Sequence, residues 1–329
     1  MRNNKDTTLR PKFSVAELYL KYGMFFILLA LVAFSSIASR SFLSVRNITN
    51  IIQSMSIVAL AAFGETMVLI LGKIDLSVGS VMALSGCISC SVASHTQNVP
   101  LAVLAGLLIG ALCGFINGFV ISCFEIPAFI ITLATMQIAR GAVLLFTNAV
   151  PVSGMGDAFR QLGQGKIFGF IPMSVLIMLV CFAICWLLLN RTCFGRYIYA
   201  CGGNESAAVA SGINTPRIVT LTYLLMGIFT GMSGIVLMSY INSGQPAGAT
   251  NYEMDAITAA IVGGTSFTGG LGSVQGTLIG CLIVGVLDNI MNLKGVSSYW
   301  QQIVRGLIIA LAVILDIKSK SLVLRKKSR

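Results

Sequence analysis

The chain has 329 residues, of which 56% are hydrophobic and only 10% are charged. A soluble domain of this length does not need so much apolar surface, and apolar runs of about 20 residues recur along the chain, so the composition predicts an integral membrane protein. The formal net charge of +11 comes from basic residues that gather at both ends and around one central loop. This placement indicates membrane topology and contact with anionic headgroups, and it excludes nucleic acid as a partner.

Ten apolar segments predict an all-α polytopic membrane protein in which some helices are broken or interrupted by glycine. The expected spans are residues 22–39, 50–71, 76–94, 99–121, 127–147, 168–190, 217–240, 254–268, 273–292 and 299–317. They form one transmembrane domain, 22–317, with a cytoplasmic loop at 191–217 and basic segments at 1–21 and 318–329. With this topology 15 Lys and Arg residues lie inside and 5 outside, which predicts that both termini are cytoplasmic.

The central loop carries the signals of a short helix. Asn204 is a good N-cap, Glu205 places a carboxylate in the first turn, and Gly212 supplies the stop. Residues 206–211 are mostly small, and Ala207, Ala208 and Ala210 would let another protein surface approach closely. A helix of about two turns is unstable alone in water. Two interpretations follow: a cytoplasmic loop with a frayed turn, or a docking helix gripped by a soluble partner.

Several ionisable residues fall within or beside the expected spans, where charge is costly. Glu65, Arg140, Asp288 and Arg305 lie inside spans and could pair with one another, line a polar cavity or carry coupled protons, with pairing favoured. Asp75, Glu253 and Asp255 are instead predicted at solvated span edges.

Glycines interrupt the expected span at 254–268. Gly263, Gly264, Gly269, Gly270 and Gly272 predict a bent or broken helix, which membranes tolerate only where protein or a water-filled cavity covers it. Elsewhere Gly106, Gly110, Gly114 and Gly118, together with Gly227 and Gly231, recur at a spacing that predicts close helix packing.

The sequence contains no evident catalytic set. It has a single His, its nine cysteines are scattered, and the pair Cys87 and Cys90 lies within a span, so small apolar packing is favoured over a metal or redox site. A phosphate-binding loop is missing as well, because Gly72-Lys73 is followed by Ile74. We therefore expect no enzyme activity, cofactor or metal, and any nucleotide hydrolysis belongs to another chain.

Several motifs together resemble one family, the permease subunits of bacterial ABC sugar importers of the ribose, arabinose, xylose and galactoside type. The similarity runs from about Tyr22 to Asp316. The motifs that carry it are Gly72-Lys73-Ile74-Asp75-Leu76-Ser77-Val78-Gly79-Ser80, Phe194-Gly195-Arg196-Tyr197, Gly202-Gly203-Asn204-Glu205, Ser211-Gly212-Ile213, Val262-Gly263-Gly264-Thr265-Ser266 and Gly269-Gly270-Leu271-Gly272-Ser273.

The resemblance implies a homodimeric pore in the bacterial inner membrane, a tandem-cassette ATPase inside and a periplasmic sugar-binding protein outside. In such permeases an E-A-A-x-x-x-G helix contacts the ATPase; Ala207, Ala208 and Gly212 fit this pattern, whereas Glu205 stands one place early. The coupling set implied here is Gly203, Asn204, Glu205, Ala207, Ala208, Gly212 and Ile213.

The mechanism implied by this resemblance is alternating access. The binding protein docks on the outer loops 150–166 and 241–253, and the interrupted segment 263–272 supplies candidate gates. Candidates for the sugar path are Glu65, Asn117, Gln137, Asp288 and Asn289, although for the three amides a helix–helix hydrogen bond is the favoured interpretation. Two rivals stay open: a proton- or sodium-coupled carrier that uses Glu65 or Asp288, and a passive channel or membrane scaffold.

Overall fold

The computed structural model describes the backbone of residues 15–327 and the side chains of residues 23–314, so most of the predicted basic ends lies outside the described side chains. Helices dominate, as predicted. The elements in chain order are α1 (Val15–Ala38), α2 (Val45–Ile70), α3 (Val78–Thr96), α4 (Val99–Cys123), α5 (Ala128–Thr147), α6 (Gly156–Gln164), β1 (Lys166–Ile167), β2 (Ile171–Pro172), α7 (Met173–Arg191), α8 (Cys193–Gly203), α9 (Glu205–Ala210), α10 (Thr215–Ile241), α11 (Tyr252–Val262), α12 (Val274–Leu293) and α13 (Ser298–Lys327).

Within the described range, seven helices are long and apolar enough to cross a membrane: α2, α3, α4, α5, α7, α10 and α12. Shorter apolar segments, Gly23–Ala38 and Ser298–Ile314, lie in α1 and α13. The helix in the expected span at 254–268 is only about half as long as a membrane-spanning helix. This helix, α11, has 11 residues, or about 16 Å at 1.5 Å per residue, against a hydrocarbon core of about 30 Å.

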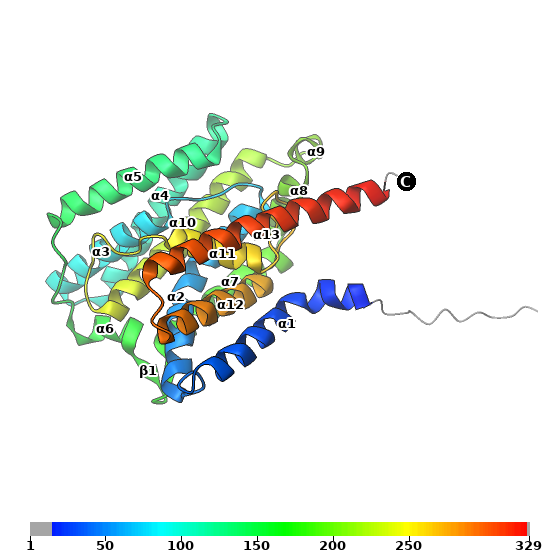
Figure 1. Cartoon of the computed structure of the whole chain (residues 1–329). Coiled ribbons are helices and arrows are strands. Elements are labelled where there is room, and N and C mark those ends of the chain that lie inside the picture. The colour runs from blue at the N-terminus through cyan, green and yellow to red at the C-terminus, as the bar shows by residue number, and fades with distance from the viewer. Residues whose placement is uncertain (1–14, 328–329) are drawn as a thin grey trace, which may run out of the picture.

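The two ends of the bundle differ in what they carry (Figure 1). The start of α1, the end of α13, and the short helices α8 and α9 lie at one end. The opposite end carries α6 and the hairpin of β1 and β2, an antiparallel pair in which Ile167 faces Ile171. An isolated bridge between Val152 and Gly244 joins the two predicted outer loops at that opposite end.

Helices α4 and α10 touch backbone to backbone. A Cβ added at Gly110 would overlap the carbonyl oxygen of Gly227, and one added at Gly114 would overlap that of Tyr223. The close helix packing that the glycine spacing predicts is therefore confirmed, since only hydrogen at these positions allows the approach.

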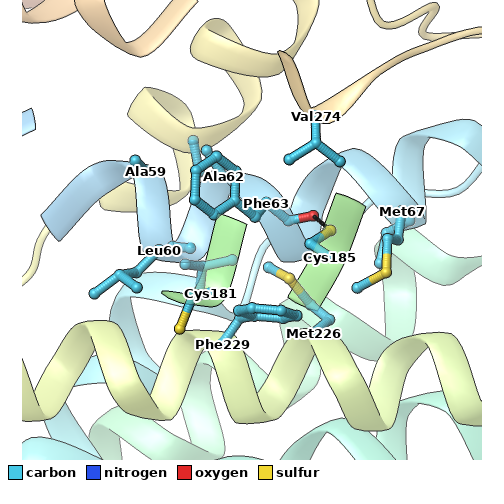
Figure 2. Close-up of a cluster of buried hydrophobic side chains, with 14 of the residues drawn as sticks. Ala59, Leu60, Ala62, Phe63, Met67, Cys181, Cys185, Met226, Phe229 and Val274 are labelled. Atoms are coloured by element: carbon cyan, nitrogen blue, oxygen red, sulfur yellow. Dashed lines mark hydrogen bonds between the residues drawn. The ribbon is translucent and has the colours of Figure 1, made fainter. Parts of the chain in front are cut away.

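The largest apolar cluster surrounds α2 (Figure 2). Phe63 of α2 belongs to this cluster together with Cys181 and Cys185 of α7 and with Met226 and Phe229 of α10. The Phe63 ring also meets that of Phe182 edge to face, with centroids 5.7 Å apart. These thiols pack as small apolar groups, and all nine cysteines are free.

Candidate functional site

The short helix predicted in the central loop is present as α9. The Asn204 side chain accepts a hydrogen bond from the Ala207 backbone N–H at 2.9 Å, which caps the first turn. At the other end Gly212 has φ of +81°, and the Ile213 N–H donates to the Ala208 carbonyl at 3.1 Å. This is a left-handed C-terminal stop that favours glycine.

The segment before α9 is helical too, which the sequence prediction of a polar loop missed. Helix α8 begins after Thr192, whose hydroxyl accepts from the Gly195 N–H at 3.2 Å. A Thr directly before an apolar run is an N-cap signal that the sequence shows. Residues 193–210 thus form two consecutive short helices.

The exposed face of α9 differs from the predicted one. Ala208 is buried against the chain's own interior, whereas Val209 has 55% of its surface exposed. Glu205, Ala207 and Ala210 are exposed on either side of it. The face open to another molecule therefore centres on Val209, which sequence reasoning did not single out.

Close glycine contacts connect the end of α8, which directly precedes α9, to two loops of the membrane domain. We call Gly72, Gly202, Gly203, Gly269 and Gly270 the glycine junction. A Cβ at Gly202 would overlap the Ile70 carbonyl oxygen, and one at Gly269 would lie 2.9 Å from the Cα of Gly72. The Gly270 N–H donates to that same Ile70 carbonyl at 2.8 Å. The end of α8, the loop after α2 and the loop after α11 therefore meet without intervening side chains.

The predicted break between α11 and α12 is confirmed. Gly264, Gly269 and Gly270 have φ values of +84°, +85° and +77°, the left-handed region that favours glycine. At Gly263 a Cβ would overlap the carbonyl oxygen of Gly276. The loop packs through Gly269 and Gly270 on the end of α2 and through Gly263 on the start of α12, whereas its Phe267 and Leu271 side chains are exposed.

The prediction that Asp75 lies at a solvated edge of a span is wrong. Asp75 is 3% exposed, because the loop after α2 folds back beneath that helix. Its N–H donates to Glu65 Oε1 at 3.2 Å, and its Oδ1 accepts from the Ser77 N–H at 2.8 Å and from the Ser77 hydroxyl at 2.6 Å. Burial raises the pKa of Asp75, and the hydrogen bonds from Ser77 oppose that rise.

Two of the three candidate amides form hydrogen bonds between helices, as favoured. Asn117 of α4 donates to the Ser77 hydroxyl at 3.2 Å and accepts from Thr135 of α5 at 2.5 Å. Asn289 of α12 and Asn47 of α2 exchange two hydrogen bonds, at 2.8 and 2.9 Å. Gln137 differs: it is exposed on α5, and no described residue bonds its side chain, so a helix–helix bond is the wrong interpretation there.

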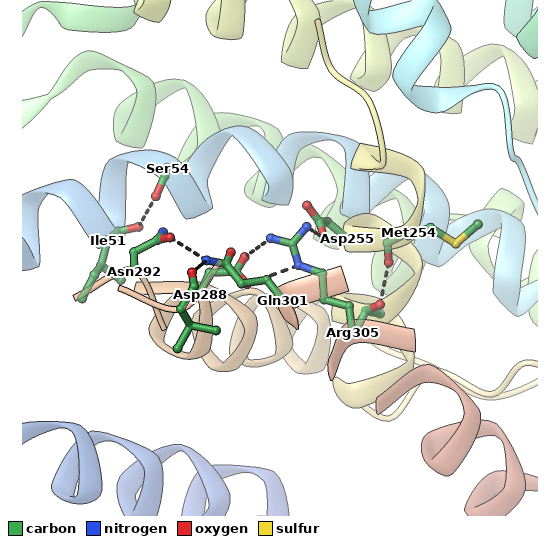
Figure 3. Close-up of polar contacts among 10 residues, drawn as sticks. Ile51, Ser54, Met254, Asp255, Asp288, Asn292, Gln301 and Arg305 are labelled. Carbon is green, nitrogen blue, oxygen red and sulfur yellow. Dashed lines mark hydrogen bonds and ion pairs between the residues drawn. The ribbon is translucent and has the colours of Figure 1, made fainter. Parts of the chain in front are cut away.

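Arg305 joins two carboxylates between α11, α12 and α13 (Figure 3). Its Nη2 lies 2.7 Å from Asp288 Oδ2, its Nε donates to Asp288 Oδ1 at 3.2 Å, and its Nη1 lies 3.1 Å from Asp255 Oδ1. The favoured pairing of Asp288 with Arg305 is therefore confirmed. The solvated edge predicted for Asp255 is wrong, since that residue is 7% exposed.

Arg140 and α6 organise the end of the bundle opposite α9. Among the described residues Arg140 forms no ion pair, so the favoured pairing with an acid is wrong for it; its guanidinium donates to the carbonyls of Pro246 and Gly248 at 2.7 and 2.9 Å and so holds the loop after α10 in place. The Gly163 N–H donates to Ser239 at 2.7 Å, which docks α6 on the end of α10. Both predicted outer loops are therefore joined to the ends of α5 and α10, and we call α6 together with the loop 242–251 the platform.

Comparison with known proteins finds similarity over nearly the whole chain. The family described as the branched-chain amino acid transport system / permease component matches residues 47–313. The ribose import permease of Bacillus subtilis is 43% identical over 98% of this chain and all of its own length, and that of Haemophilus influenzae is 41% identical over 92% of this chain and 95% of its own.

A D-allose permease of Escherichia coli is 35% identical over 96% of this chain and 97% of its own length. No solved structure matches. These similarities cover the membrane helices, α8 and α9, the glycine junction and the platform. The chain therefore belongs to the family of ABC-importer permease components, within the group that includes bacterial sugar permeases.

Proposed function

We propose that the chain is the membrane-spanning subunit of an ATP-driven importer that moves a monosaccharide into the cytoplasm. The observation that carries this proposal is the attachment of α9. A short capped helix with an exposed apolar residue, Val209, lies at the end of the bundle and follows directly on α8, whose last residues belong to the glycine junction. This arrangement suits a contact with a separate ATPase. The backbone at the end of α8 touches two interhelical loops directly, so a displacement of α9 and α8 would displace these loops as well.

The remaining partners follow from the same arrangement. The end that carries α9 and both described chain ends faces the cytoplasm, and the platform of α6 and the loop after α10 faces outward. A periplasmic sugar-binding protein docks on that platform. Two copies of the chain enclose the sugar path between them, and a tandem-cassette ATPase switches the path from outward to inward exposure. The relatives named for ribose and D-allose support a monosaccharide as cargo.

Reconstituted vesicles test this function. Vesicles would contain the chain with its ATPase, the binding protein would be added outside, and radiolabelled D-ribose and D-allose would serve as probes. We expect uptake that requires ATP, the ATPase and the binding protein, and that continues when an ionophore removes the ion gradients. Uptake by this chain alone that stops with the ionophore would contradict the proposal.

A proton-coupled carrier is the second candidate, and one observation favours it. Glu65 is fully buried in α2, and its Oε2 accepts no hydrogen bond from the part of the chain that the structure describes. Buried acids of this kind carry protons in many pumps and carriers. Asp288 fits the role less well, because Arg305 holds both of its oxygens.

Glu65→Gln separates the two candidates. The importer needs only a group that accepts the Asp75 N–H, and a neutral amide supplies one without placing a charge in the core. We therefore expect Glu65→Gln to keep ATP-dependent uptake within about twofold of wild type, because the amide oxygen still accepts this hydrogen bond. Loss of uptake in a well-folded Glu65→Gln protein would favour the carrier instead.

A further inference from the structure

A polar cavity that is open on one side lies between helices of the subunit, away from α9. It has a volume of about 250 Å³ and opens between α2, α11, α12 and α13. Asp255 is in the first turn of α11 and Asp288 is in the last turns of α12, so the charged wall lies at the end of the bundle that carries α6. The cavity is lined by Ser54, Met55, Val58, Thr250, Tyr252, Asp255, Cys281, Val284, Gly285, Asp288, Asn292 and Arg305.

The wall of the cavity contains more acidic than basic groups. Two carboxylates face a single guanidinium, which gives Asp288 two contacts and Asp255 one. Asp255 is more than nine-tenths buried, and its Oδ1 accepts no well-formed hydrogen bond in the described structure, since its one contact is the ion pair with Arg305. A carboxylate has about four acceptor positions, and leaving them empty in a buried wall is costly. Asp255 therefore has acceptor capacity that Arg305 and the other described residues of the lining leave unused.

The other lining residues indicate what kind of molecule could donate hydrogen bonds to Asp255. Ser54 and Thr250 carry hydroxyls, Asn292 carries an amide, and Tyr252 adds an aromatic ring, while Met55 and Val284 form an apolar wall. At about 30 Å³ per water molecule, the space holds on the order of eight waters, which is enough for one small organic molecule. A metal ion is not favoured, because it would use little of this space and the described residues contain no group of three His, Cys, Asp or Glu that could hold one.

We propose that this cavity is a subsite for one neutral polyhydroxylated molecule, of the size of a monosaccharide, within each permease subunit. Hydroxyl groups of the ligand donate to Asp255 and Asp288, and Arg305 keeps the two carboxylates in position. The Tyr252 ring and the apolar wall contact the carbon-bound hydrogens of the sugar. This subsite rests on the proposed function, which it deepens by placing a sugar inside the permease and not only in the binding protein.

Direct binding to the permease–ATPase complex in nanodiscs, with no binding protein present, tests the subsite. Radiolabelled D-ribose and D-allose are the probes. We expect saturable binding of at least one of them. Asp255→Asn, which keeps the shape of the side chain but removes its charge, is expected to raise the Kd about tenfold or more. Val58→Phe, which fills the cavity and leaves the ion pairs intact, is expected to abolish binding.

The matched control is Asp157→Asn, which changes a carboxylate on α6 whose side chain is 84% exposed and does not line the cavity, and is expected to bind like wild type. Hydrogen–deuterium exchange of the wild-type complex gives a second test that needs no variant. Saturating sugar is expected to slow exchange at 252–258 and 284–292. Absence of binding, protection elsewhere only, or wild-type affinity in both cavity variants would overturn the subsite.

The vesicle assay distinguishes a failure of the subsite proposal from a failure of the proposed import function. If uptake requires ATP and the ATPase while the cavity binds no sugar, the subsite is refuted and the import function stands. If an ion gradient drives uptake, the import function is refuted whatever the cavity binds.

Discussion

Replacing Gly114 with leucine is expected to prevent the chain from folding in the membrane. A Cβ at this position would overlap the Tyr223 carbonyl oxygen and lie 3.0 Å from the Gly227 Cα. Both obstacles are backbone of α10, so no side-chain rotation relieves them and the two helices must separate. Overpacking of side chains alone costs about 1–3 kcal/mol, and a total stability of about 5–15 kcal/mol leaves little margin for a larger penalty.

Size-exclusion chromatography of fluorescently tagged protein measures this effect. The yield of monodisperse protein is expected to fall more than tenfold with Gly114→Leu. The control is Gly141→Leu, another helical glycine in an apolar span, where a Cβ would meet nothing within 4 Å. That variant is expected to match wild type. Equal yields for the two variants would show that α4 and α10 do not touch as described.

Replacing Val209 with aspartate is expected to abolish ATP-driven uptake while the chain still folds. Val209 is half exposed at the centre of the open face of α9, so its side chain contributes little to the fold of the isolated chain. In the assembled importer it would be buried against the ATPase. Burying an unpaired carboxylate there costs several kcal/mol, which corresponds to a loss of affinity of a hundredfold or more.

Two measurements on the same protein separate folding from assembly. Thermal unfolding of Val209→Asp is expected to match wild type, and co-purification with the ATPase is expected to fall to background. Val150→Asp is the control, since Val150 is 61% exposed at the opposite end of the bundle. It should leave co-purification unchanged. If Val209→Asp still co-purified with the ATPase as wild type does, α9 would not be part of the ATPase contact.

The sequence predicts those features that depend on a few neighbouring residues. The spans follow from runs of apolar side chains, and the break after α11 follows from glycines that adopt left-handed conformations. Helix α9 was predictable because Asn204 and Gly212 mark its two ends. The contact of α4 with α10 was predictable in kind, because glycines recur on one face of each helix.

Features that depend on tertiary contacts were not predictable in the same way. Asp75 stands beside Lys73 in the sequence and so suggests a solvated edge, yet its loop folds back and buries it against Glu65. Asp255 becomes buried because Arg305, fifty residues further along the chain, reaches it from α13. Whether Ala208 or Val209 faces outward likewise depends on how α9 rests on the membrane domain.

The central claim is that α9 is the place where a separate ATPase moves this chain. Site-specific cross-linking tests it directly, with a photoreactive side chain in place of Val209 and the assembled importer in native membranes. We predict a cross-linked product that contains the ATPase subunit and whose yield changes when ATP is bound. The account would be contradicted if no nucleotide-hydrolysing subunit were captured, or if position 209 were labelled from outside intact cells by a membrane-impermeant reagent.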